Sequence, residues 1–148
     1  MNLEDILKMW AEDSVIDDHQ LDKSSIDTAK LHSKYLEIFT VTKLQLKKAE
    51  TALDNLLKDK WLWYNGKLDK AAIDSKGWAY DPFDGCNKPL KGEMDYYYNA
   101  DPDIQKAKAR VDLLEVQKET IEEIITNLKW RHQTIGNAIR WRQFLSGD

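Results

Sequence analysis

The chain has very little cysteine, proline or glycine for its length. Its 148 residues include one cysteine, three prolines and six glycines. The single cysteine, Cys86, excludes a disulfide within the chain and is typical of a reducing compartment, so we expect a cytoplasmic protein. Apolar runs are only a few residues long, which excludes a membrane-spanning helix. The acidic N-terminus lacks the basic and apolar pattern of a secretion signal.

Motifs that would mark an enzyme or a cofactor site are also missing. The chain has no glycine-rich phosphate loop, no two histidines at metal-ligand spacing and no cysteine pair. Cys86 has no local partner that would make it a nucleophile. The run Asp17-Asp18-His19 is more typical of a solvated loop than of a metal site. We therefore expect a protein that is not an enzyme, with no catalytic residues, no metal and no cofactor.

The net charge of −4 conceals an uneven distribution. Residues 1–42 and 77–103 are acidic, whereas residues 43–76 hold eight basic and five acidic side chains, and residues 104–148 hold eight and six. Both basic segments also contain tryptophans. The acidic segments fit either a basic partner protein or a role in keeping bound nucleic acid on one path.

Periodic apolar residues predict a mainly helical chain. A short first helix begins after Asn2, and a second runs from about Ser24 or Ser25 to about Tyr64, where Asn65-Gly66 ends it. At 1.5 Å per residue the second helix would be roughly 60 Å long, so it must pack against another long helix or another subunit. Its apolar stripe comprises Tyr35, Phe39, Leu46, Ala49, Leu53 and Leu56.

A third helix begins with Asp101 as N-cap and Pro102 at its first position. Apolar residues recur along it with heptad spacing, which favours helix–helix assembly. Leu113, Ile124 and Ala138 widen this apolar face, as expected for a bundle or ring. We assign oligomerisation to Ile104, Val111, Leu114, Ile121, Ile125, Leu128, Ile135 and Ile139.

Residues 67–100 join these two long helices. They contain three of the six glycines and two of the three prolines, so we expect one long irregular central loop. Tyr96-Tyr97-Tyr98 within it is open to three interpretations: a short strand, a stacking platform, or packing against the helices. The predicted fold class is therefore a mainly α protein, with long amphipathic helices that form a bundle or ring-type homo-oligomer.

The segment Leu57–Gly66 combines lysines and aromatic residues at the end of the second helix. Lysines neutralise phosphates and aromatic rings stack on unpaired bases, and single-stranded nucleic-acid binding uses both. A solvated helix end with aromatics in the core explains the same residues. The pattern recurs in Lys129-Trp130-Arg131 and Arg140-Trp141-Arg142, which fit a second contact surface or the rim of a subunit interface. The residues alone leave nucleic-acid binding and packing open.

Short motifs along most of the chain resemble the UvsY-type recombination mediator proteins of large tailed bacteriophages. Their order and spacing, together with the chain length, carry the resemblance. The matching pieces are the opening Met1-Asn2-Leu3-Glu4-Asp5, Ile16-Asp17, Ser33-Lys34-Tyr35-Leu36, the stretch from Lys58 to Gly66, Gly92-Glu93-Met94, Asn99-Ala100-Asp101-Pro102-Asp103 and the terminal amphipathic helix.

This resemblance implies a ring of six or seven subunits in the cytoplasm of the host cell. Such a protein binds single-stranded DNA and helps a RecA-like phage recombinase displace the phage single-strand-binding protein. The family's DNA-binding pair falls on Lys58 and Lys60, although the family pattern has arginine at the second position, and lysine lacks its bidentate fork. The terminal helix would drive assembly. The stretch 72–90 is longer than the family's usual connection, which leaves its role open.

We therefore predict an N-terminal DNA-binding region with the central loop over residues 1–100 and a C-terminal oligomerisation helix over residues 101–148. The predicted DNA contacts are Lys58, Lys60, Trp61, Trp63 and Tyr64, with Lys43, Lys47, Lys48 and Lys67 as auxiliary charge. The alternative is a helical scaffold or adaptor that binds only protein. A hydrolase that uses the acidic loop is the weakest alternative.

Overall fold

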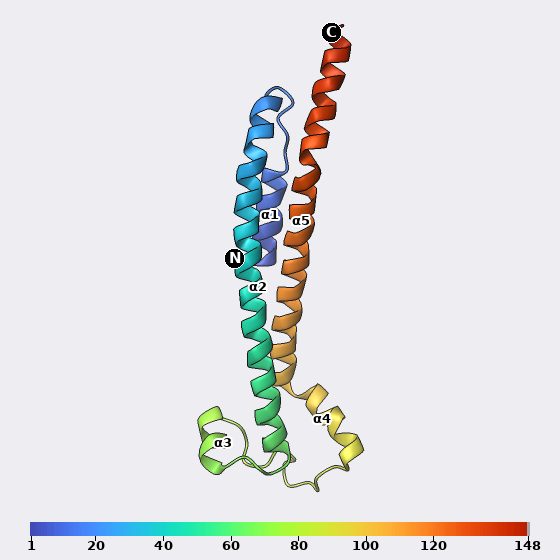
Figure 1. Ribbon diagram of the computed structural model, residues 1–148. Helices are drawn as coiled ribbons and strands as arrows, with labels where there is room; N and C mark the ends of the chain where they lie inside the picture. The colour runs from blue at the N-terminus through green and yellow to red at the C-terminus, as the bar shows by residue number, and fades with distance from the viewer. Residues whose placement is uncertain (148) are drawn as a thin grey trace. The chain divides into compact units, whose positions relative to one another are not determined.

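The computed structural model describes residues 1–147, and within them it contains helices and no strand, which confirms the mainly helical prediction. Figure 1 shows the helices in chain order. They are α1 (Leu3–Asp13), α2 (Leu21–Tyr64), α3 (Lys70–Lys76), the short 3₁₀ helix η1 (Lys91–Glu93), α4 (Met94–Ala100) and α5 (Pro102–Ser146). None of the helices in this range has the length and apolarity needed to cross a bilayer.

The helix ends follow the capping residues that the sequence contains. Asn2 caps α1 in a full capping box, because its side chain accepts from the Asp5 N–H while the Asp5 carboxylate accepts from the Asn2 N–H. α2 ends at Tyr64, as predicted, but begins at Leu21 rather than near Ser24. Ser24 is not a cap: its hydroxyl accepts from the Asp17 N–H and ties the preceding connection to the first turn of the helix.

The prediction of one irregular loop over residues 67–100 was wrong, because this stretch contains α3, η1 and α4. Asp69 begins α3 by accepting from the Ala72 N–H, and Gly77 ends it with a left-handed φ of 70°. Tyr96-Tyr97-Tyr98 lies in α4 rather than in a strand. These helices are short, and the glycines and prolines around them are typical of a loop. The sequence therefore did not predict them.

The chain folds as two compact units. The terminal unit comprises Met1–Gln45 and the described chain from Leu114 onward, and the central unit comprises Leu46–Leu113. Both α2 and α5 therefore contribute residues to each unit. These units differ from the division into residues 1–100 and 101–148, which concerns function and stays a prediction.

The core of the terminal unit is built by three helices. Figure 1 shows α1 lying beside α2 and α5. Tyr35 of α2 is fully buried, meets Trp10 of α1 edge-on with ring centroids 5.5 Å apart, and donates its hydroxyl hydrogen to the Asp13 carboxylate at 2.8 Å. The other buried residues of this core are Ile6, Ile121, Ile124, Ile125 and Leu128.

Arg131 of α5 holds the end of α1 in place. Its side chain is 5% exposed, and its terminal nitrogens donate to the backbone carbonyls of Asp13, Ser14 and Val15 at 3.1, 3.5 and 3.3 Å. These carbonyls belong to the last residue of α1 and to the two residues after it, where intrahelical donors are lacking. A buried cation at this point also complements the negative end of the helix dipole.

The heptad positions of α5 are mostly covered within the chain. Of the eight residues predicted for oligomerisation, only Ile139 is exposed. The four from Ile121 to Ile135 lie in the terminal unit and are buried. Ile121, Ile125 and Leu128 among them share a core with Ile6 of α1 and Tyr35 of α2. A heptad seam predicts that a helix packs but does not specify against which chain. Their role in assembly stays a prediction.

Candidate nucleic-acid interface

The last turns of α2 place the two lysines of the basic pair on opposite sides of the helix. Each residue of an α-helix advances by about 100°, so residues two apart differ by about 200°. Lys58 accordingly shares a side with Trp61, three residues later, whereas Lys60 shares a side with Trp63 and Tyr64. The exposures follow this alternation: Lys58 and Trp61 are exposed, and Lys60, Trp63 and Tyr64 are buried.

The exposed side carries a tryptophan between cations. Trp61 is 46% exposed, and the Lys67 ammonium lies 4.6 Å from the centroid of its ring. Lys47, also exposed, precedes Lys58 by about three helical turns and therefore lies on nearly the same side of α2. We call Lys58, Trp61 and Lys67 the exposed strip. It offers an aromatic face with positive charge beside it, the combination that binds a base and its phosphates.

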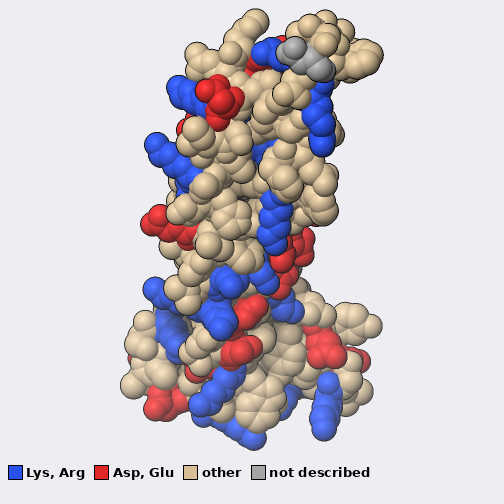
Figure 2. All heavy atoms as spheres, turned by 45° about the horizontal axis from the view of Figure 1, so that its top comes forward, with Lys and Arg blue, Asp and Glu red and all other residues tan. Residues whose placement is uncertain are grey.

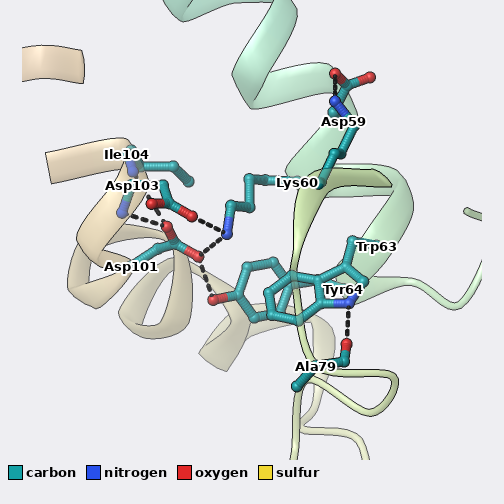
Figure 3. Close-up of polar contacts among 9 residues, drawn as sticks. Asp59, Lys60, Trp63, Tyr64, Ala79, Asp101, Asp103 and Ile104 are labelled. Carbon is teal, nitrogen blue, oxygen red and sulfur yellow. Dashed lines mark hydrogen bonds and ion pairs between the residues drawn. The ribbon is translucent and has the colours of Figure 1, made fainter. Parts of the chain in front are cut away.

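The buried side of the same turns is organised around the Lys60 ammonium. Lys60 is 3% exposed, and its Nζ lies 3.0 Å from Asp101 Oδ2 and 2.9 Å from Asp103 Oδ2. The same atom lies 4.5 Å from the ring centroid of Trp63 and 4.0 Å from that of Trp78. Figure 3 shows the lysine reaching from α2 to the two carboxylates at the start of α5. Its charge is therefore neutralised inside the central unit.

Asp101 connects helix capping to this ion pair. One carboxylate oxygen accepts from the Asp103 and Ile104 N–H groups, and the other accepts from the Tyr64 hydroxyl at 2.7 Å and pairs with Lys60. Burial raises the pKa of Asp101, but the hydrogen bonds from Tyr64, Ile104 and Lys60 together outweigh it and hold that pKa below its ordinary value. Burial and the same hydrogen bond raise the pKa of Tyr64.

Trp63 and Tyr64 belong to the core of the central unit. The Trp63 indole N–H donates to the Ala79 carbonyl at 2.9 Å, and its ring lies 5.3 Å from that of Trp78. Tyr64 meets Tyr98 edge-on at 5.3 Å. The buried members of this core are Trp63, Tyr64, Ile73 and Met94. Neither Trp63 nor Tyr64 presents a free face on which a base could stack.

The remaining predicted lysines lie at the surface. Lys47 and Lys48 are exposed in the central unit, and Lys43 is exposed in the terminal unit, with its ammonium 4.9 Å from the Phe39 ring centroid. Figure 2 shows basic and acidic side chains interspersed on the face in view. DNA binding here would therefore depend on particular residues rather than on a uniformly positive surface.

Three residues of the Lys60 site were not predicted to act together. Asp101 was predicted only as a cap, and Trp78 and Asp103 had no assigned role. They are 18 to 43 residues from Lys60 in the chain, and no local spacing links them. The sequence held one weak signal: a helix places Lys58 and Lys60 on opposite faces, so both lysines would not face solvent on the same side.

Comparison with known proteins places the chain in a family. The family model described as "Recombination, repair and ssDNA binding protein UvsY" matches residues 9–148. The chain belongs to the UvsY family. No curated protein and no solved structure gave a significant match. The match covers nearly the whole chain and confirms the resemblance, because it includes both long helices and the exposed strip.

Membership of the UvsY family associates the chain with single-stranded DNA, recombination and repair rather than with a known enzymatic reaction. Within residues 1–147, no group of three or more histidine, cysteine, aspartate or glutamate side chains is arranged to hold a metal ion.

Proposed function

We propose that this UvsY-family chain is a recombination mediator. It binds single-stranded DNA, helps displace single-strand-binding protein and loads a RecA-like recombinase, without a chemical step. The observation that carries the proposal is the exposed strip: Trp61 lies open at the end of α2 with the Lys67 ammonium at its ring and Lys58 on the same side of the helix. The family match supports its assignment to single-stranded DNA.

Each element of the strip has a separate role in this proposal. Trp61 stacks on one base, and such stacking is worth about 1–3 kcal/mol per base. Lys58 and Lys67 neutralise adjacent phosphates, while Lys47, Lys48 and Lys43 add weaker auxiliary charge. Lys60, Trp63 and Tyr64, which the sequence had also placed among the contacts, are buried, and we leave them out of the direct contact set.

Assembly multiplies this modest site. We propose a ring of six or seven copies, in which each subunit contributes one exposed strip and a bound strand gains from the effective concentration of neighbouring sites. Because most of the heptad seam is covered within the chain, the apolar residues left exposed near the end of α5 are the better candidates for subunit contact. They are Trp130, Ile139, Trp141, Phe144 and Leu145.

Trp141 and Phe144 form a compact part of that surface. Their rings are stacked with centroids 5.5 Å apart, and both are well exposed. We expect the Trp141→Ser, Phe144→Ser double variant to lower the oligomer mass measured by light scattering and to keep its helical circular dichroism. Leu90→Ser, at an exposed position outside this surface, is the control. An unchanged mass in the double variant would reject this surface.

Fluorescence anisotropy with a labelled oligonucleotide at several salt concentrations tests the DNA assignment. Lys58→Ala should weaken binding and reduce the slope of log K against log salt by about 0.7, the value for one phosphate contact on a single strand. Trp61→Ala should weaken binding with little change of slope, and Trp61→Phe should restore part of it.

Lys106→Ala supplies the matched control, since Lys106 is exposed in the same central unit but lies outside the strip. Equal effects of Lys58→Ala and Lys106→Ala would remove the strip as the contact site. Absence of any salt-sensitive binding by the unaltered protein would favour the alternative of a helical scaffold that binds only protein.

A further inference from the structure

We propose that Lys60 is a positioning residue for the exposed strip and not a phosphate ligand. This inference rests on the proposed function, because it concerns how the strip that contacts DNA is held. It separates the two lysines of the basic pair: Lys58 acts outward on the DNA, and Lys60 acts inward on the fold.

The first reason is that the Lys60 ammonium is already paired and buried. An ammonium group has three N–H donors. Two point to carboxylates at 3.0 and 2.9 Å, and the rings of Trp78 and Trp63 lie beside the remaining part of the group. The side chain is almost completely removed from solvent. Contact with DNA would require both ion pairs to break and would leave the Asp101 carboxylate buried without its cation.

The second reason is that the Lys60 ammonium connects separate segments of the central unit. It links the end of α2 to the start of α5 through Asp101, and to the segment after α3 through Trp78. All of these residues belong to the central unit. On the same turn, Trp63 donates to the Ala79 carbonyl and Tyr64 donates to Asp101, so the same two segments are each fixed twice against the buried side of α2 (Figure 3).

The exposed strip depends on this anchoring through the helix itself. Trp61 is the residue directly after Lys60, and the Lys67 N–H donates to the Leu62 carbonyl at 2.8 Å, so the chain beyond the helix folds back onto its last turn. Fixing the buried side therefore sets the direction in which Trp61 points and keeps Lys67 over its ring. Lys60 would thus affect DNA binding without touching DNA.

A charge-neutral double variant distinguishes positioning from phosphate contact. Lys60→Met keeps most of the unbranched side chain but leaves Asp101 without its cation, whereas Lys60→Met with Asp101→Asn removes both buried charges together. Asp101→Asn keeps an oxygen for the helix cap and is the reference for the double variant. Lys58→Met serves as the example of a lost phosphate contact. Each is titrated with a labelled oligonucleotide at several salt concentrations, and near-ultraviolet circular dichroism reports the packing of the buried tryptophans.

We expect Lys60→Met to lose more than about tenfold in affinity, together with its near-ultraviolet signal. The double variant should recover both, to within about threefold of the Asp101→Asn affinity, and should keep the wild-type salt slope. Lys58→Met should instead reduce the slope by about 0.7 with an unchanged spectrum.

The inference is overturned if the double variant keeps a native spectrum but shows the reduced affinity and slope of Lys58→Met. It is also overturned if the double variant does not restore the near-ultraviolet spectrum, because the role of Lys60 would then not be to neutralise Asp101. A wild-type protein that does not bind the oligonucleotide would refute the proposed function itself, which is a separate result.

Discussion

Replacing Arg131 with methionine tests how the terminal unit is held together. The guanidinium is buried and makes three hydrogen bonds to carbonyls at the end of α1 and just beyond it, so it is the main polar connection between α5 and α1. Methionine fills much of the same space but supplies no donor. The substitution leaves Asp13, Ser14 and Val15 without these partners, and it removes one of the cations near the Asp13 carboxylate.

The expected loss of stability follows from the geometry of the three bonds. A hydrogen bond from a charged donor contributes about 1.5–3 kcal/mol, but the contact to Ser14 at 3.5 Å is at the limit of a useful bond. The Arg131 Nε is buried without a partner in the structure, and removal of that nitrogen offsets part of the loss. We therefore expect about 2–4 kcal/mol of destabilisation in total.

Urea unfolding followed by circular dichroism measures this change in the free energy of unfolding. Lys129→Met is the matched control, because Lys129 is exposed on the same helix, and its effect should stay within about 0.5 kcal/mol. Arg131→Lys should lie between the wild type and Arg131→Met, since one ammonium cannot reach all three carbonyls. A loss below about 0.5 kcal/mol for Arg131→Met would show that the carbonyls are equally well satisfied by water, and the proposed anchoring would be wrong.

Two further predictions concern the cores and their titration. Ile121→Ala, at a fully buried position of the terminal core, should cost about 2–5 kcal/mol in urea unfolding, and a smaller loss would mean that the core collapses around the cavity. The folded pKa values of Asp13 and Asp101 lie below the ordinary value, so the stability they contribute is present above about pH 4 and is lost as pH falls through the folded values. Acid titration of Asp101→Asn should show a shallower loss. Tyr35 and Tyr64 have raised pKa values, so their contribution is present below about pH 10 and is lost at higher pH; Tyr64→Phe should reduce that alkaline loss.

Local signals in the sequence predicted the long helices well. Asn65-Gly66 fixed the end of α2, and Asp101-Pro102 fixed the start of α5, because each motif satisfies or removes the backbone groups that a helix end exposes. The sequence could not specify which surface covers the heptad seam. The apolar repeat is the same whether the cover comes from α1 and α2 of one chain or from a second subunit.

For the basic pair, the sequence pattern was sufficient to separate the two lysines once helical geometry is applied to it. The resemblance to the family groups Lys58 and Lys60 as one DNA-binding pair, yet helical spacing places them on opposite sides. What the sequence lacked was the identity of the carboxylates: Asp101 and Asp103 come to Lys60 only because α5 begins beside the end of α2. A lysine next to tryptophans in the sequence can therefore either contact DNA at the surface or form a buried ion pair. The tertiary fold places Lys60 in a buried ion pair.

The same alternation limits how much DNA one chain can hold. With Trp63 and Tyr64 in the core, Trp61 is the one aromatic side chain among the predicted contacts that remains open for stacking. One stacked base and two or three neutralised phosphates provide only weak, salt-sensitive binding, with stacking worth about 1–3 kcal/mol. A mediator built on such a site needs several copies acting on one strand, because effective concentration then raises the overall affinity without any new contact. The burial of Lys60, Trp63 and Tyr64 thus makes assembly a requirement of the proposed function rather than an addition to it.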